Sequence, residues 1–179
     1  YPRQMKAGAV IDDSDIWEIL RNANHAPSHR RTEPWRFIVF SGESLKDYFE
    51  ELSKIYQKIT PLEEFKAEKL IKYQEKANTL SHLIAICMKR DPKESVPVQE
   101  EEYAVACSVQ NILLSLKAYG IIGYWSTGKV AFSEEIKAYL NLGPEDKCMG
   151  FLQLGSPLDN LPEIAKKQMS LIEEKVEWR

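Results

Sequence analysis

Apolar residues recur at helical spacing in five segments of the chain. In the first segment they fall at positions i, i+3, i+4 and i+7, namely Ile16, Ile19, Leu20 and Ala23. This stripe predicts an amphipathic helix that ends before Pro27. The same periodicity predicts helices over 45–58, 63–78 and 100–119, and a last one from Ser133 to Gly143. Gly120 provides the stop for the longest of them, because glycine readily adopts the left-handed conformation that follows many helices.

Four apolar runs are too short for helices and predict strands, at 35–40, 83–89, 121–126 and 148–154. Turn residues bound them, such as Ser41-Gly42 after the first and Gly155-Ser156-Pro157 after the last. The predicted order is helix, strand, helix, helix, strand, helix, strand, helix, strand. This order predicts an α+β domain built in layers, with a small central sheet.

The composition of the chain argues against a nucleic-acid-binding protein and against a membrane-spanning one. The 179 residues are 44% hydrophobic, which supplies enough apolar material for one folded domain. With 24 Lys and Arg against 27 Asp and Glu, the formal charge is −3, so the basic footprint of a nucleic-acid-binding protein is missing. The longest apolar run, Leu83 to Met88, is far shorter than the roughly 20 residues that span a bilayer. We therefore expect a soluble, cytoplasmic protein with neither nucleic acid nor membrane as a partner.

The residues that usually carry catalysis are few. Cys87, Cys107 and Cys148 are too dispersed for a disulfide framework or a zinc site. Each lies in an apolar run, so we expect all three thiols to pack as small hydrophobic groups. None of the three histidines belongs to a metalloprotease motif, and no serine-hydrolase elbow or dinucleotide-binding glycine fingerprint occurs. We therefore predict no metal site.

Two polar clusters stand out instead. Residues 25–37 place histidine, arginine and serine side chains in a loop with two prolines, between the first helix and the first strand. Residues 124–129 lie at the carboxyl end of a predicted strand, where ligands often bind to sheets that helices cover. Loops held by rigid elements commonly carry binding groups, but solvated connectors have the same composition. Composition alone leaves both interpretations open.

Four motifs, taken in order, resemble the FMN-dependent nitroreductase family. They are Ala26-Pro27-Ser28-His29 through Glu33-Pro34-Trp35-Arg36-Phe37, Val109-Gln110-Asn111-Ile112-Leu113-Leu114 with Gly120 after it, Tyr124-Trp125-Ser126-Thr127-Gly128, and Gly150-Phe151-Leu152-Gln153-Leu154-Gly155-Ser156-Pro157. The resemblance covers about residues 11–157 and implies a nitroreductase-like three-layer fold, with a small, mostly antiparallel sheet flanked by helices. It also implies a homodimer that holds one FMN at each of two sites built from both subunits.

The resemblance assigns particular residues to FMN. One subunit would contact the flavin or its ribityl phosphate through His25, Ser28, His29 and Arg31. The other subunit would contact the flavin ring through Trp125, Ser126 and Thr127. Basic residues near the C-terminus, Lys166 and Lys167, would lie against the phosphate.

Two positions depart from the family's pattern. Glu33 stands where many members carry Gln before the Pro-Trp pair. The family opens with an Arg-Arg-Ser signature that grips the FMN phosphate, whereas this chain starts at Tyr1, without an initiator Met, where the residues after that signature would sit. We therefore expect a phosphate-binding segment to precede Tyr1.

Because a flavin performs the redox chemistry itself, the protein need only hold and tune it, and we expect no catalytic side chain. The resemblance implies an oxidoreductase in which NADH or NADPH reduces FMN by hydride transfer, and a nitroaromatic, quinone or similar acceptor reoxidises it, in a ping-pong mechanism. We expect segments 56–65 and 91–99 to shape the acceptor pocket.

We expect residues 1–157 to form the flavin-binding domain and residues 158–179 to form a tail that packs on the partner subunit. The tail carries Leu171, Ile172, Val176 and Trp178 without a strong apolar period. Two other functions stay open at this point. The chain could be a dimeric protein that binds a flavin or another planar ligand without turnover, or an acidic interaction domain.

Overall fold

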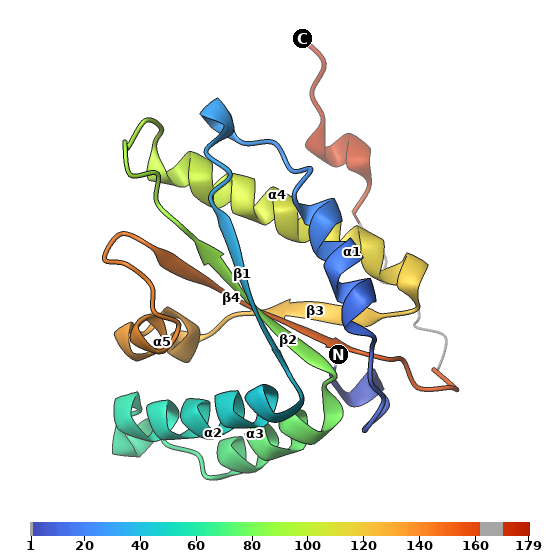
Figure 1. The fold of residues 1–179 in the computed structure, drawn as a ribbon. Helices are drawn as coiled ribbons and strands as arrows, with labels where there is room; N and C mark the ends of the chain where they lie inside the picture. The colour runs from blue at the N-terminus through green and yellow to red at the C-terminus, as the bar shows by residue number, and fades with distance from the viewer. Residues whose placement is uncertain (1, 162–169) are drawn as a thin grey trace.

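The computed structural model describes residues 2–161 and 170–179, and in that part of the chain four strands form one antiparallel sheet (Figure 1). The strands are β1 (Trp35–Ser41), β2 (His82–Met88), β3 (Ile122–Ser126) and β4 (Lys147–Gly155). Their order across the sheet is β1-β2-β4-β3, and each neighbouring pair is antiparallel. The predicted strand positions and the antiparallel sheet are therefore confirmed.

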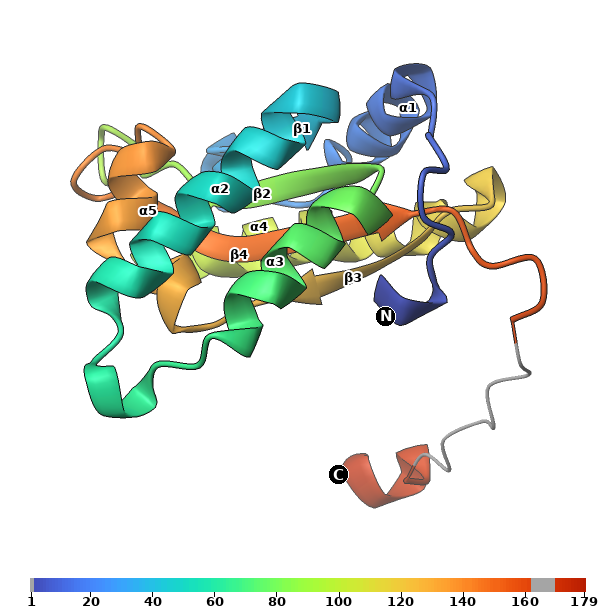
Figure 2. The same cartoon turned by 90° about the horizontal axis from the view of Figure 1, so that it is seen from below.

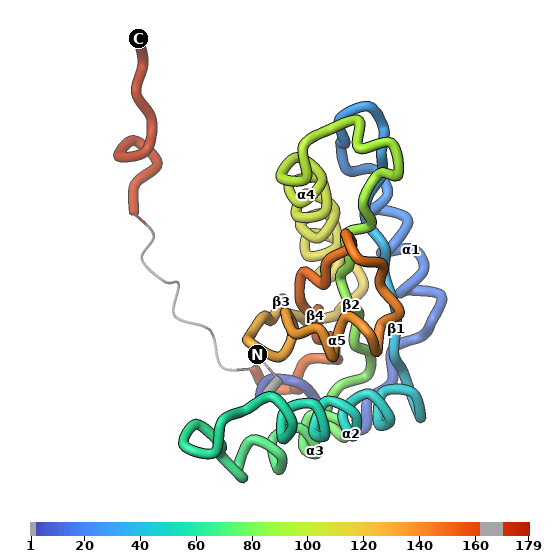
Figure 3. The backbone as a smooth tube through the Cα atoms, turned by 90° about the vertical axis from the view of Figure 1, so that its left-hand side faces the viewer, coloured from blue at the N-terminus to red at the C-terminus, as the bar shows by residue number. Residues whose placement is uncertain are grey.

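Helices cover both faces of the sheet, which makes three layers (Figures 2 and 3). On one face lie α1 (Asp13–Ala23) and α4 (Val98–Leu116), which pack against each other. On the other face lie α2 (Gly42–Ile59), α3 (Glu68–Thr79) and the short α5 (Glu134–Tyr139). The α+β three-layer fold is thus as predicted. Among the described residues, no helix combines the length and the apolar character needed to cross a bilayer.

The two central strands form the middle of the core. Every residue of β2 is buried, and the last six residues of β4 are buried as well. Side chains alternate between the faces, so Ile84 and Ile86 join the apolar cluster under α1 and α4, while Leu83 and Ala85 join the cluster under α2, α3 and α5. Strands buried on both faces read as continuous apolar runs, which is why the 83–89 run was recognisable in the sequence.

The predicted helix over 63–78 is interrupted in the structure. A 3-10 turn at Leu62–Glu64 is followed by an extended Phe65, and α3 begins only at Glu68. Tyr56 explains the interruption, because its ring stacks on Phe65 at a centroid distance of 5.4 Å and its hydroxyl accepts the Lys66 N–H at 2.9 Å. These contacts hold the chain in a bend that the charge pattern did not reveal.

Two other predictions need correction. The helix predicted from Ser133 to Gly143 is shorter, because Asn141 adopts a left-handed conformation with φ of +52° and the chain turns after Tyr139. Cys107 does not pack as a core residue: it is exposed on α4, because it lies between the positions that α4 turns toward the sheet. The expectation of burial was correct for Cys87 and Cys148.

A buried polar bridge fixes the start of α1 against the sheet. Ser81 Oγ accepts the backbone N–H of Ile11 at 2.8 Å and lies 2.9 Å from Nδ1 of His82. His82 is only 1% exposed, and its Nε2 reaches Asp13 Oδ1 at 2.9 Å. The bridge supplies partners for polar groups that would otherwise be buried alone, which proteins rarely permit.

Replacing Ser81 by Ala should lower the free energy of unfolding by about 1–3 kcal/mol, because the Ile11 N–H loses its buried acceptor. Denaturant titration of the purified protein measures this change. Ser53→Ala is a matched control, because the Ser53 hydroxyl only donates to the Phe49 carbonyl within α2. Equal stability of the two variants would contradict the role given to Ser81.

Candidate functional site

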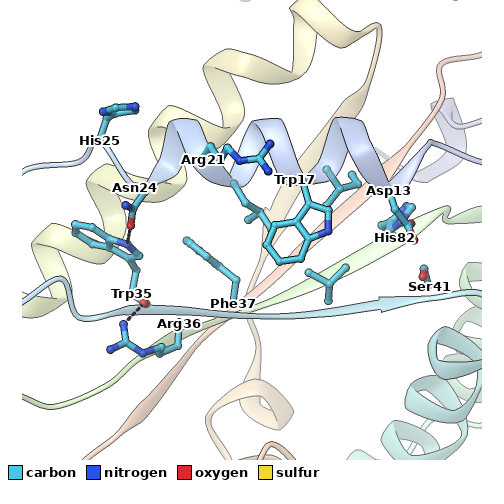
Figure 4. A pocket seen from close by; sticks show the side chains of 13 residues that line it. Asp13, Trp17, Arg21, Asn24, His25, Trp35, Arg36, Phe37, Ser41 and His82 are labelled. Carbon is cyan, nitrogen blue, oxygen red and sulfur yellow. Dashed lines mark hydrogen bonds and ion pairs between the residues drawn. The ribbon is translucent and has the colours of Figure 1, made fainter.

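The first predicted cluster lies on the loop between α1 and β1. His25 follows the end of α1 and is exposed beside a cavity of about 830 Å³ between α1 and the outer strand β1 (Figure 4). The Trp35 indole N–H donates to Asn24 Oδ1 at 2.9 Å, which fixes the end of α1 to the start of β1. The loop thus has both ends attached to rigid elements.

Between these ends the loop takes an unusual path. Arg30, Arg31 and Glu33 all have positive φ values, between 44° and 55°, which residues with a side chain seldom adopt. The Glu33 N–H donates to Ser28 Oγ at 3.2 Å, and Arg36 Nη1 donates to the Glu33 carbonyl at 2.8 Å. This tight turn displays its arginines to solvent. Within the described residues, neither Arg30 nor Arg31 has a carboxylate partner.

The N-terminal turn of α4 supports this loop. The Glu100 carboxylate contacts His29 Nδ1 at 2.5 Å, so Nε2 is the ring nitrogen that faces outward without a contact from the described residues. The next residue, Glu101, is fully buried and accepts from Arg90 Nη1 at 2.6 Å and from the Asp91 backbone N–H at 3.0 Å. One helical turn therefore orients His29 and also anchors the segment that follows β2.

The second predicted cluster lies at the end of β3. The Trp125 indole N–H donates to the Met149 carbonyl at 2.9 Å, and the Ser126 hydroxyl donates to the Phe151 carbonyl at 3.1 Å. Both side chains are half-buried and therefore have fixed positions, whereas Thr127 is exposed. We call Trp125, Ser126 and Thr127 the β3 half-site, and His25, Ser28, His29 and Arg31 the β1 half-site.

One buried acceptor beside the β3 half-site has no partner. Gln153 is 4% exposed, and its Nε2 donates to Ser126 Oγ at 2.7 Å and to Tyr124 Oη at 3.2 Å. Its Oε1 makes no hydrogen bond in the described structure. Gln153 and the β3 half-site residues Ser126 and Thr127 line a cavity of about 190 Å³ under α3. A buried carbonyl oxygen without a donor is uncommon.

The two half-sites lie at opposite edges of the sheet and at different levels along the strands, because Phe151, the partner of Ser126, is level with Ala85 and Ile38 in the middle of β2 and β1. Trp35 opens β1 opposite Met88, and Ser126 closes β3 opposite Phe151. Strands β2 and β4 separate them, which corresponds to three strand spacings, or about 14 Å. A single chain therefore does not join them into one pocket. Lys166 and Lys167 lie outside the described residues.

The two segments expected to shape an acceptor pocket each lie near one half-site. Lys129 lies two residues after the β3 half-site and forms an ion pair with Glu64 at 2.6 Å. The segment 91–99 is held by Glu101, the neighbour of the residue that contacts His29. Their assignment to an acceptor pocket stays a prediction.

Sequence reasoning missed three supporting residues. Glu100 and Glu101 read as ordinary charges at a helix start, and only the position of α4 against the loop reveals their roles. Gln153 lies in a strand that is otherwise apolar, and this isolated amide was the signal that could have indicated a polar cavity. Gly150 belonged to a recognised motif, but the sequence did not show why the structure requires glycine at this position.

Gly150 lets β4 approach the β3 half-site. Its φ is +114°, and a Cβ placed there would lie 2.6 Å from the Ser126 carbonyl oxygen and 2.8 Å from Trp125 Nε1. Gly150→Ala should therefore lower the free energy of unfolding, with about 1–3 kcal/mol from the backbone conformation alone. Gly128→Ala is the control, because no atom lies within 4 Å of its added methyl group. Denaturant titration that gave equal losses for both variants would contradict this account.

Comparison with known proteins gives the family of this chain. The family model described as "Nitroreductase family" matches residues 3–156. The Bacillus subtilis protein named "Putative NAD(P)H nitroreductase YfhC" is 28% identical over 159 residues, which cover 88% of this chain and 79% of that protein. The Escherichia coli protein named "Putative NAD(P)H nitroreductase YdjA" is 27% identical over 142 residues, or 79% of this chain and 75% of that one.

Solved structures share the fold at low sequence identity. A nitroreductase-like protein from Bacillus cereus superposes with a TM-score of 0.80 at 21% identity, covering 99% of this chain and 92% of that one. A Desulfovibrio desulfuricans protein in complex with FMN gives a TM-score of 0.69 at 18% identity, covering 98% and 90%. The match of the family model over nearly the whole length, together with this fold, leads to one conclusion. The chain belongs to the nitroreductase family.

Proposed function

We propose that this protein is an FMN-dependent oxidoreductase that passes electrons from NADH or NADPH to a nitroaromatic, quinone or similar acceptor. The observation that carries the proposal is the pair of polar half-sites on the two outer strands of the sheet, in a chain of the nitroreductase family. Flavin binding in the Desulfovibrio desulfuricans relative supports the choice of cofactor. The free thiols among the described residues are consistent with a reducing compartment such as the cytoplasm.

The residues of both half-sites fit a phosphorylated flavin. Arg30 and Arg31 have no carboxylate partner among the described residues, so their guanidinium groups are available to a phosphate. His29 presents Nε2, which donates a hydrogen bond when the ring is protonated. In the β3 half-site, Trp125 keeps its N–H on Met149 and offers its ring as a flat, half-buried surface.

Bound FMN would accept hydride from the nicotinamide donor and deliver electrons to the acceptor in alternating half-reactions. The chain's own residues would bind and orient the group. The arginines and His29 would hold the phosphate end, while Trp125, Ser126 and Thr127 would position the ring. The hydrogen bonds of Trp125 and Ser126 to β4 hold these two side chains in place, so a flavin ring that bound beside them would cost little further ordering.

We also propose that the protein works as a homodimer with shared sites. A separation of three strands keeps the two half-sites of one chain apart, and a two-fold partner would place the β1 half-site of one subunit against the β3 half-site of the other. The tail, residues 158–179, would pack on the partner subunit. Exposed apolar side chains in its described part support this role, namely Leu171, Ile172, Val176 and Trp178.

The purified protein should bind FMN, and the double variant His29→Ala, Arg31→Ala should bind it at least about 100-fold more weakly. Each charge-assisted contact contributes about 1.5–3 kcal/mol, and each 1.4 kcal/mol is tenfold in affinity. Titration of the apoprotein with FMN, followed by flavin fluorescence, measures the dissociation constants. Lys46→Ala is the control, because Lys46 lies on α2, next to the opposite end of β1, and pairs only with Glu43 in the described structure.

The same preparation tests catalysis. With FMN bound, NADH or NADPH should be oxidised when a quinone or nitroaromatic is added, and the double variant should lose this activity at low FMN. A protein that binds FMN but shows no turnover with either nucleotide would favour the binding protein instead. A protein that stays colourless with excess FMN would refute the proposed function.

Ile172→Asp should weaken the dimer, because Ile172 would lose its apolar burial on the partner. Both subunits carry the substitution, so a loss of about 1.5–3 kcal/mol per side chain raises the dimer dissociation constant by about 100-fold or more. Sedimentation equilibrium measures this constant, and Glu174→Gln in the same 3-10 turn is the matched control. An unchanged dimer dissociation constant would contradict the packing of the tail on the partner subunit. A wild-type protein that is monomeric would refute the shared site.

A further inference from the structure

Two buried cysteines face each other across neighbouring strands. Cys87 on β2 is paired in register with Cys148 on β4. Both side chains lie in the apolar cluster under α2, α3 and α5, so they point to the same face of the sheet. Each thiol is the main influence on the pKa of the other, and Cys148 Sγ donates to the Gly150 carbonyl oxygen at 3.9 Å. The third cysteine, Cys107, is exposed on α4 and lies in neither buried cluster.

An irregularity in β4 creates this arrangement. Phe151 faces α2 and α3, so strict alternation along β4 would turn Cys148 toward α1 and α4. The register instead shifts between Ile86 and Cys87: Ile86 pairs with Gly150, Cys87 pairs with Cys148, and Met149 is the extra residue. A bulge of this kind reverses the alternation. It turns Met149 toward α1 and α4, and it places Cys148 beside Cys87.

The two thiols differ in access. Cys87 is completely buried, whereas Cys148 is 8% exposed and lines a cavity of about 280 Å³. The cavity lies between α5 and the loop before β4, and Lys137 and Lys147 also line it. A small solute in this cavity would meet Cys148 and not Cys87.

The contact also makes the thiols chemically unequal. Donation of a hydrogen bond by the Cys87 S–H lowers the pKa of the Cys148 thiol below its usual value. The same hydrogen bond, with burial, raises the pKa of Cys87. Cys148 is therefore the thiol that ionises first, and the thiolate is the nucleophilic form.

We propose that Cys87 and Cys148 form a redox-active dithiol that hydrogen peroxide, entering the cavity beside α5, converts into a cross-strand disulfide. The Cys148 thiolate attacks one peroxide oxygen, which breaks the O–O bond, gives Cys148 sulfenic acid and releases hydroxide, which takes up a proton to form water. The Cys87 sulfur then attacks the Cys148 sulfur, which forms the S–S bond and expels the sulfenic oxygen. That oxygen leaves as a second water, after taking up the Cys87 proton. Two thiols lose two hydrogens, and one peroxide becomes two waters.

The strand geometry suits this product. Residues directly opposite in an antiparallel pair have Cα atoms about 4.5–5.5 Å apart, within the range of about 4.4–6.8 Å found for disulfides. Closure would therefore require little backbone movement. The proposal does not depend on flavin binding, because none of the residues in either half-site supplies a thiol.

The experiment uses the full-length chain with Cys107→Ser, which removes the exposed thiol. Treatment of the folded protein with a small excess of hydrogen peroxide should lower its intact mass by two hydrogens and give one peptide cross-link, Cys87 to Cys148, that dithiothreitol reverses. Adding Cys87→Ala should stop the reaction at a Cys148 sulfenic acid, which dimedone traps. Adding Cys148→Ala instead should abolish both the cross-link and the dimedone adduct.

The wild-type chain keeps the test decisive even if a variant fails to fold. Its Cys107 reports that peroxide was effective, and native-state cross-linking can be mapped without any substitution. Oxidation of Cys107 with both other thiols unreacted would overturn the proposal. A cross-link that forms only in urea would do the same, as would an adduct on Cys87 in place of Cys148.

Discussion

The burial of β2 and β4 on both faces is the constraint on which the rest of the structure depends. Both strands are also hydrogen-bonded along both edges, because β1 and β3 flank them. Packed helices and neighbouring strands therefore leave little open surface at the centre of the sheet. Polar chemistry must lie at the strand ends or on the outer strands, and the two polar clusters lie there, at the start of β1 and the end of β3.

This constraint also keeps the two half-sites of one chain apart. Strands β2 and β4 lie between them, so in the proposed homodimer one flavin would contact the β1 half-site of one subunit and the β3 half-site of the other. Within each chain, different kinds of group hold the two half-sites in place. The β1 half-site depends on side chains of α4, through Glu100 and its buried neighbour Glu101. The β3 half-site depends on main-chain carbonyls of β4, at Met149 and Phe151.

Most of the fold could be predicted from the sequence, because periodicity and turn residues report local structure directly. Every helix and strand along residues 13–155 lies near its expected place, and Gly120 ends α4 and its 3-10 extension with φ of +65°. The failures have different causes. The bend at Phe65 and the partners of Glu101 are set by contacts with Tyr56 and Arg90, which the hydrophobic pattern does not reveal. Cys107 is exposed because it lies off the face of α4 that packs on the sheet, and the left-handed Asn141 shortens α5. The family resemblance supplied the candidate residues, but not their distribution over two edges of the sheet.

The bulge in β4 is responsible for two features that the sequence offered no reason to connect, namely the position of Trp125 and the pairing of Cys148 with Cys87. Its extra residue, Met149, provides the carbonyl that holds the Trp125 indole, and the register shift brings Cys148 to Cys87. Gly150 permits both, since any side chain there would collide with Ser126 and Trp125. A disulfide at Cys148 would add a covalent link next to the residue that positions Trp125. The bulge thus holds Trp125 in the β3 half-site through Met149, and it places the thiol pair at the residue next to Met149.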